Sequence, residues 1–152
     1  MTESKINEKT LLEKENTIRA MLDGIRALPL ASLADFTADR RNQAAAESYL
    51  RRSLEALFDL GRHILAKGFG KGITEYKETA LELMNRGLIG KTNAASMKIL
   101  AGYRNRMVHF YNEISERELF DICTSQLSDI ESVLMEINGW IKQNPEKINC
   151  AL

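Results

Sequence analysis

The spacing of apolar residues constrains the fold of this chain more than any other feature of its sequence. These residues recur every three or four positions along almost the whole length, which is the period of one helix face. The 152 residues include only two prolines and nine glycines, so helices can run long between breaks. We find no competing β-strand alternation. The sequence therefore predicts an all-α protein.

Prolines and glycines divide this pattern into separate helices, because proline cannot continue a helix and glycine commonly ends one. The predicted segments, in order, are a first helix closed by Pro29, a connector over 30–38, a second helix from about Asp39 to the glycine-rich stretch 68–72, a third over about 74–85, a break at Gly87 and Gly90, and a fourth over about 92–110.

A capping box is predicted to open the last helix, with Ser115 capping the first turn and Glu118 reaching back. A polar tail over about 145–152 follows the helix. The apolar residues of this last helix alternate spacings of three and four, as at the seam of a helical bundle: Phe120, Cys123, Leu127, Ile130, Leu134, Ile137 and Ile141. We expect residues 1–152 to form one domain, an antiparallel up-and-down bundle of four to five helices.

Composition is that of a globular protein, with 44% hydrophobic and 28% charged residues. No apolar run approaches the ~20 residues of a membrane helix, and the N-terminus is polar, unlike a signal sequence. Cys123 and Cys150 are too few for a disulfide framework, and Cys123 is expected in the core. We expect a cytoplasmic protein that makes no membrane contact.

Charge is unevenly distributed, although the formal net charge of the chain is zero. Residues 40–110 carry a net charge of +7, and the segments before and after them are acidic. A basic middle can attract a polyanion such as RNA. It can equally consist of charges that solvate the outer faces of helices.

One stretch, 102–111, gathers side chains suited to phosphate chemistry. His109 can exchange a proton near neutral pH, and Arg104 offers a fork of donors that fits phosphate oxygens. Asn105 can orient an imidazole or hold an oxygen. Together these groups fit a metal-free cleavage of RNA, in which a 2′-hydroxyl attacks the neighbouring phosphorus. The alternative is that Arg104 is a surface residue and His109 a structural histidine.

Helical geometry relates these three residues to one another. At about 100° per residue, Asn105 and His109 share a face, whereas Arg104 and His109 lie about 140° apart. Arg104 and His109 could therefore meet at one phosphate if the helix bends near its end. They could also meet if a second chain brings its own copy, and two copies would supply two histidines. We expect a homodimer with a composite cleft.

The motif resembles the Arg-x4-His-x-Tyr signature of HEPN domains in the HepT family, with Arg104, His109 and Tyr111 at the named positions. Asn105 supplies the polar residue typical after the arginine, whereas Phe110 stands where the family often has a small residue, which puts substrate choice in doubt. The order of predicted helices also fits. Further resemblance lies in the second predicted helix, at Asp39, Arg40, Arg41, Glu47, Glu55, Ala56, Asp59, Gly61, His63 and Ile64.

The resemblance implies a metal-independent endoribonuclease toxin that dimerises around the motif and needs no cofactor. It also implies a partner, a MntA-like minimal nucleotidyltransferase antitoxin that attaches AMP to the motif tyrosine. Carried over residue by residue, Arg104 and His109 are catalytic, Asn105 supports them and Tyr111 is the modification site. His63 has two interpretations, a structural or dimer-supporting residue or an active-site contact.

Two alternatives stay open at this point. The chain could be a catalytically silent HEPN module that binds a nucleotidyltransferase or RNA without cutting it. It could also be a plain helical scaffold. An intact set of Arg104, Asn105 and His109 favours the enzyme.

Overall fold

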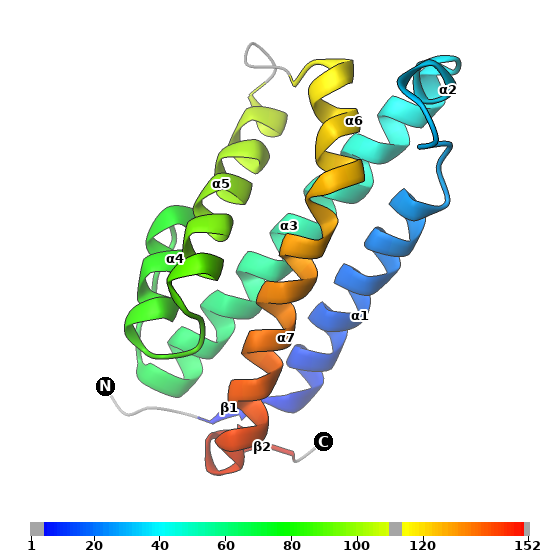
Figure 1. Ribbon diagram of the computed structural model, residues 1–152. Helices are drawn as coiled ribbons and strands as arrows, with labels where there is room; N and C mark the ends of the chain where they lie inside the picture. The colour runs from blue at the N-terminus through cyan, green and yellow to red at the C-terminus, as the bar shows by residue number, and fades with distance from the viewer. Residues whose placement is uncertain (1–4, 110–113, 151–152) are drawn as a thin grey trace.

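The longest helix, α3 (Arg40–Phe69), runs the length of the molecule, and other helices pack along it (Figure 1). The structure, a computed structural model, describes residues 5–109 and 114–150. The other helices in these residues are α1 (Glu8–Arg26), α2 (Leu33–Thr37), α4 (Tyr76–Asn85), α5 (Lys91–Val108), α6 (Glu116–Ser125) and α7 (Leu127–Gln143).

The bundle is formed by α1, α3, α5, and α6 continued by α7, which alternate in direction along the chain (Figure 1). The short helix α4 lies beside α3 and α5, and α1 packs closely along α3. This arrangement confirms the predicted all-α, up-and-down bundle. None of the described helices is long and apolar enough to cross a membrane.

Local signals set most helix ends. Asp39 caps α3 by accepting a hydrogen bond from the Arg41 backbone N–H at 2.9 Å. Gly70 ends α3 in the left-handed region with φ of 66°, which only glycine adopts freely. The predicted capping box is half correct. The Ser115 hydroxyl accepts from the Glu118 N–H at 3.1 Å, but the Glu118 carboxylate is bound to Arg106.

Three features of the fold differ from the sequence prediction. The connector over 30–38 contains α2, capped by Ser32 and anchored by the fully buried ring of Phe36. The last predicted helix is two helices, α6 and α7, separated at Gln126. The fourth predicted helix ends at Val108 rather than Phe110.

The tail is a fourth region of difference, because it is not simply a polar end. A 3₁₀ turn (Pro145–Lys147) leads into β2 (Ile148–Asn149), which pairs in parallel with β1 (Ile6–Asn7). Ile6 is fully buried against Gly68, where an added Cβ would lie 2.9 Å from the Ile6 side chain. The sequence predicted no strand, since a two-residue pair is too short to show alternation.

The core confirms the predicted apolar faces. Leu11, Ile18, Leu22 and Ile25 are buried on α1, and the seam residues from Cys123 to Ile137 are buried on α6 and α7. Burial raises the pKa of the Cys123 thiol to about 12, so it stays protonated at neutral pH. Cys123 is therefore the core residue that was expected.

Candidate active site

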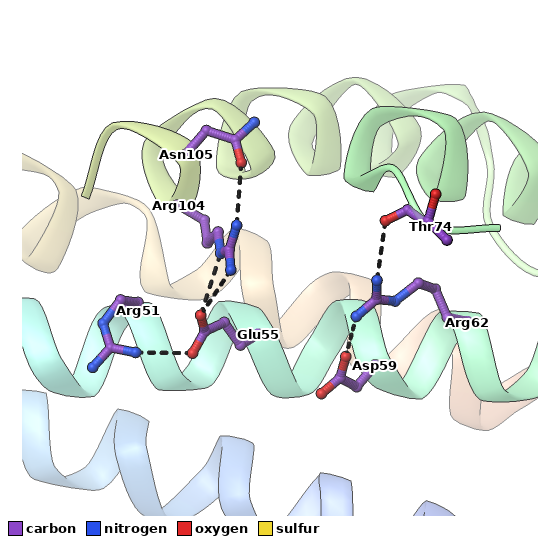
Figure 2. A network of polar contacts seen from close by, with 7 residues as sticks. All are labelled: Arg51, Glu55, Asp59, Arg62, Thr74, Arg104 and Asn105. Atoms are coloured by element: carbon purple, nitrogen blue, oxygen red, sulfur yellow. Dashed lines mark hydrogen bonds and ion pairs between the residues drawn. The ribbon is translucent and has the colours of Figure 1, made fainter. Parts of the chain in front are cut away.

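Arg104 leaves the C-terminal part of α5 and points towards α3 (Figure 2). Its Nη2 and Nε atoms donate to the Glu55 Oε2 atom at 3.1 and 3.3 Å. Both side chains are about three-quarters covered, with exposed fractions of 26% and 27%. A guanidinium held by a carboxylate in this way keeps a defined position next to solvent.

Glu55 has a second cationic partner on its own helix. Arg51 lies one turn earlier on α3 and donates from Nη1 to the Glu55 Oε1 atom at 3.0 Å. Each carboxylate oxygen therefore accepts from a different arginine (Figure 2). Glu55 is the residue that orients Arg104 from the side of α3.

Tyr76 forms the aromatic support of this region. The Arg104 Cζ atom lies 4.7 Å from the centroid of its ring, and the Arg62 Cζ atom lies 5.1 Å from it. The Phe58 ring stacks on Tyr76 with centroids 4.4 Å apart and planes at 3°. Burial raises the pKa of the Tyr76 hydroxyl, and the two arginines oppose this only in part. A neutral ring under two cations stabilises both through cation–π attraction.

Arg62 connects the C-terminal part of α3 to the segment that leads into α4. Its Nη1 atom donates to the Thr74 carbonyl oxygen at 3.0 Å, and its Nη2 atom donates to Asp59 (Figure 2). Asp59 also lies 3.6 Å from the Lys14 ammonium of α1. These contacts fix the segment before α4, and with it Tyr76, relative to α3.

A solvent-open pocket of about 490 Å³ lies between α3, the start of α4 and the last turns of α5. We call it the cationic pocket, since three of its lining side chains are basic. Its lining residues are Arg62, Thr74, Glu75, Tyr76, Lys77, Arg104 and Asn105.

Asn105 adjoins Arg104 on the rim of this pocket. Its side-chain oxygen accepts from the Arg104 Nη1 atom at 3.5 Å, the upper limit of a hydrogen bond. Its carbonyl oxygen accepts from the His109 backbone N–H at 3.2 Å. The structure thus brings Arg104 and Asn105 together at the pocket.

His109 is the residue at which α5 ends. Its backbone is extended, with φ of −104° and ψ of 96°, and its side chain is exposed. Its backbone N–H still bonds to the Asn105 carbonyl oxygen one turn earlier, so the shared face of Asn105 and His109 stays a prediction. Phe110 and Tyr111 lie outside the described residues.

Arg106 has a structural role in the described part of the chain. Its two terminal nitrogens each donate to a Glu118 carboxylate oxygen at 2.7 Å. This bidentate pair joins the last turn of α5 to the first turn of α6. The pair therefore holds together the two helices, α5 and α6, that flank the last residues of the motif.

His63 lies apart from these groups, at the junction of α3 with β1. Its Nε2 atom accepts a hydrogen bond from the Asn7 backbone N–H at 3.1 Å. Burial, followed by the charges of Lys67 and Lys14, holds the pKa of His63 below its ordinary value. A neutral, accepting imidazole fits the structural interpretation of this residue.

The family profile described as "Ribonuclease HepT-like" matches residues 18–137, which is most of the chain. The chain belongs to the HepT-like ribonuclease family. This assignment confirms the resemblance inferred from the motif.

Individual relatives agree with this family. The HepT-like chain is 27% identical over 121 residues to the tRNA nuclease HepT of Aphanizomenon flos-aquae (strain 2012/KM1/D3), covering 79% of this chain and 82% of that protein. Its fold resembles the tri-AMPylated Shewanella oneidensis HEPN toxin solved in complex with an MNT antitoxin, with a TM-score of 0.78, 22% identity, and coverage of 86% and 97%. It also resembles YutE, a cytosolic protein of unknown function from Bacillus subtilis, with a TM-score of 0.75, 13% identity, and coverage of 92% and 94%.

Sequence reasoning on this HepT-like chain missed the roles of Glu55, Arg62, Tyr76 and Lys77. Glu55 was noted only as a position of family resemblance. The spacing of Arg51, Glu55, Asp59 and Arg62 already places four charged residues along one stripe of α3. Nothing in the sequence shows that this stripe faces α5, because that depends on how the helices pack.

Proposed function

We propose that this chain is an RNA-cleaving toxin of a toxin–antitoxin pair, in which Arg104 and His109 act on the scissile phosphate. The observation that carries the proposal is the placement of Arg104. It is held by Glu55 and Tyr76 at the edge of a cationic pocket, five residues before the exposed His109. Membership of a ribonuclease family supports the same reaction.

In the proposed reaction, the neutral imidazole of one His109 removes the proton of a ribose 2′-hydroxyl. The oxygen attacks the adjacent phosphorus and forms a 2′,3′-cyclic phosphate, while the bond to the 5′-oxygen breaks. A protonated imidazole gives that oxygen its proton. Arg104 donates to the phosphate oxygens as negative charge builds on them, and Asn105 supports it. These side chains supply each role without a metal ion.

The proposed enzyme is a homodimer with a composite cleft. Two proton transfers need two groups in opposite protonation states, and two copies of the chain supply two His109 side chains. A dimer centred on the end of α5 would also place two Arg104 side chains near one RNA strand.

We further propose that an MNT-type nucleotidyltransferase neutralises the toxin by transferring AMP groups to Tyr111. The solved Shewanella oneidensis relative is tri-AMPylated and in complex with an MNT antitoxin, which supports this partner. Tyr111 lies two residues after His109 in the sequence. Added phosphates there would repel RNA and fill space beside the proposed catalytic groups. Transfer RNA is the first substrate to test, since the curated relative is a tRNA nuclease.

Growth assays with and without the partner test this proposal. Expression of the wild-type chain alone should arrest growth, whereas His109→Ala should not, at equal amounts of folded protein. Co-expression with an MNT-type partner should restore growth and add AMP masses to the Tyr111 peptide. A silent binding module predicts instead that the wild type and His109→Ala affect growth equally, which would overturn the catalytic proposal.

A further inference from the structure

The cationic pocket offers more basic groups than cleavage at one phosphate requires. We propose that it binds phosphate groups of the RNA strand next to the cleaved one, as a backbone subsite that the reacting groups do not include. This inference rests on the proposed function, because it takes the strand to run across Arg104.

The lining of the pocket is more basic than acidic. Arg62, Lys77 and Arg104 line it, and Glu75 is the one acidic residue among the described residues of its lining. Lys77 is exposed in the first turn of α4 and has no ion-pair partner among the described residues. It can therefore bind a phosphate without first breaking an ion pair.

Both arginines are positioned and still have donors to offer. A guanidinium carries five N–H donors. The hydrogen bonds to Asp59 and the Thr74 carbonyl use one N–H on each terminal nitrogen of Arg62 and leave three of its five donors. Arg104 is held by Glu55 and Tyr76. Because these side chains are already ordered, an anion that binds them loses little of its affinity to side-chain ordering.

The aromatic ring in the pocket does not favour recognition of a base. Tyr76 stacks on Phe58 and lies under the guanidinium groups of Arg62 and Arg104. A base would have to displace these contacts to stack on the ring. The pocket is therefore suited to the charged backbone, which carries no sequence information itself.

The position of the pocket connects it to the reaction. Arg104 and Asn105 belong both to the motif and to the pocket's lining, whereas Arg62 and Lys77 extend the basic surface towards α4. A strand that places one phosphate at Arg104 thus has a neighbouring phosphate within this surface. Lys77 is the best residue to test, because its exposed side chain supports no described contact of the fold.

Binding can be measured without cleavage by using a fluorescein-labelled 2′-O-methyl oligouridine, which lacks the attacking hydroxyl. Lys77→Ala should raise the Kd about fivefold at low salt, the effect of losing about 1 kcal/mol. It should also lower the slope of log K against log salt by about 0.7, the value for one phosphate contact on a single strand. Lys77→Glu should weaken binding further.

Lys9→Ala is the matched control, since it removes one exposed lysine from α1, which packs along α3 and lies away from α4 and α5. It should leave the Kd and the slope unchanged. Equal binding by the Lys77→Ala and Lys9→Ala proteins would overturn the subsite. If oligouridine binding depends on Lys77 but no RNA is cut, the subsite stands and the ribonuclease proposal fails. If RNA cleavage needs His109 but oligouridine binding does not depend on Lys77, the ribonuclease proposal stands and the subsite fails.

Discussion

Glu55 lies between the guanidinium groups of Arg51 and Arg104. We expect Glu55→Gln to lower kcat for RNA cleavage about tenfold, with a smaller change in KM. The amide keeps the size of the side chain but loses the charge that fixes Arg104, and a charge-assisted hydrogen bond contributes about 1.5–3 kcal/mol before solvent screening. Steady-state kinetics on a labelled RNA would measure both constants.

The control for this change is Glu13→Gln, which removes a charge from the exposed face of α1. It should leave kcat and KM unchanged. If the Glu55→Gln and Glu13→Gln proteins cleave RNA at the same rate, Glu55 does not position Arg104.

His63 provides a pH-dependent contribution to stability. Its pKa is lowered in the folded state, so the unfolded chain binds the proton more readily. The stabilising contribution is therefore present above the ordinary histidine pKa of about 6.5 and is lost as pH falls below it towards the folded-state value. We expect His63→Gln, which keeps an acceptor for the Asn7 N–H, to flatten the fall in unfolding free energy between neutral and mildly acidic pH. Urea titrations at several pH values would measure it, and an identical pH profile would refute it.

Residues such as Arg104, Asn105 and His109 could be selected from sequence because their chemistry is visible in their types and spacing. Their positions could not be predicted in full. The sequence placed the end of this helix at about Phe110, whereas α5 ends at Val108 and His109 is its C-cap residue with an extended backbone. No sequence pattern indicates that Tyr76 belongs to the site, because its role comes from contacts with Phe58 and two arginines on other helices.

At the scale of elements, the α3–α4 connection sets the geometry of the cationic pocket. Gly70 ends α3 with φ of 66°, and Thr74 follows on the pocket's rim. Gly70→Ala should destabilise the protein by about 1 kcal/mol, because a Cβ is disfavoured in the left-handed region. This corresponds to a fall in Tm of about 2–4 °C for a domain of this size.

Gly72→Ala is the control for this prediction, since Gly72 has no positive φ and no atom within 4 Å of an added Cβ. Its Tm should stay the same or rise slightly. Thermal unfolding followed by circular dichroism compares the two variants. A Tm for the Gly70→Ala protein at or above that of the Gly72→Ala protein would contradict the account of this helix end.

Element boundaries were predictable where capping residues or glycines mark them, as at Asp39 and Gly70. The break at Gln126 was missed for a physical reason. Cys123, Leu127 and Ile130 are buried on both sides of it, so the apolar period continues through the break unchanged. Periodicity reports which face is buried and does not report whether the backbone hydrogen bonds are continuous.

At the scale of the whole molecule, the predicted bundle was confirmed because the helical pattern covers most of the chain. The homodimer is a proposal about how two bundles meet. If the cleft is composite and uses both His109 side chains, a large excess of His109→Ala protein should suppress RNA cleavage by the wild type, because most wild-type chains are then in mixed dimers with a single His109. Activity would be measured after subunit exchange. A cleavage rate per wild-type chain that stays unchanged in the excess of His109→Ala protein would refute a site that combines the two chains.

The central claim is that Arg104 and His109 cut RNA with side chains alone. The most direct measurement is cleavage of purified tRNA in EDTA by the wild-type protein, Arg104→Ala and His109→Ala, with the ends of the products identified by mass spectrometry. We expect the wild type to leave 2′,3′-cyclic phosphate ends and both variants to leave the tRNA intact while remaining folded. Cleavage by the His109→Ala protein at the wild-type rate would contradict the account.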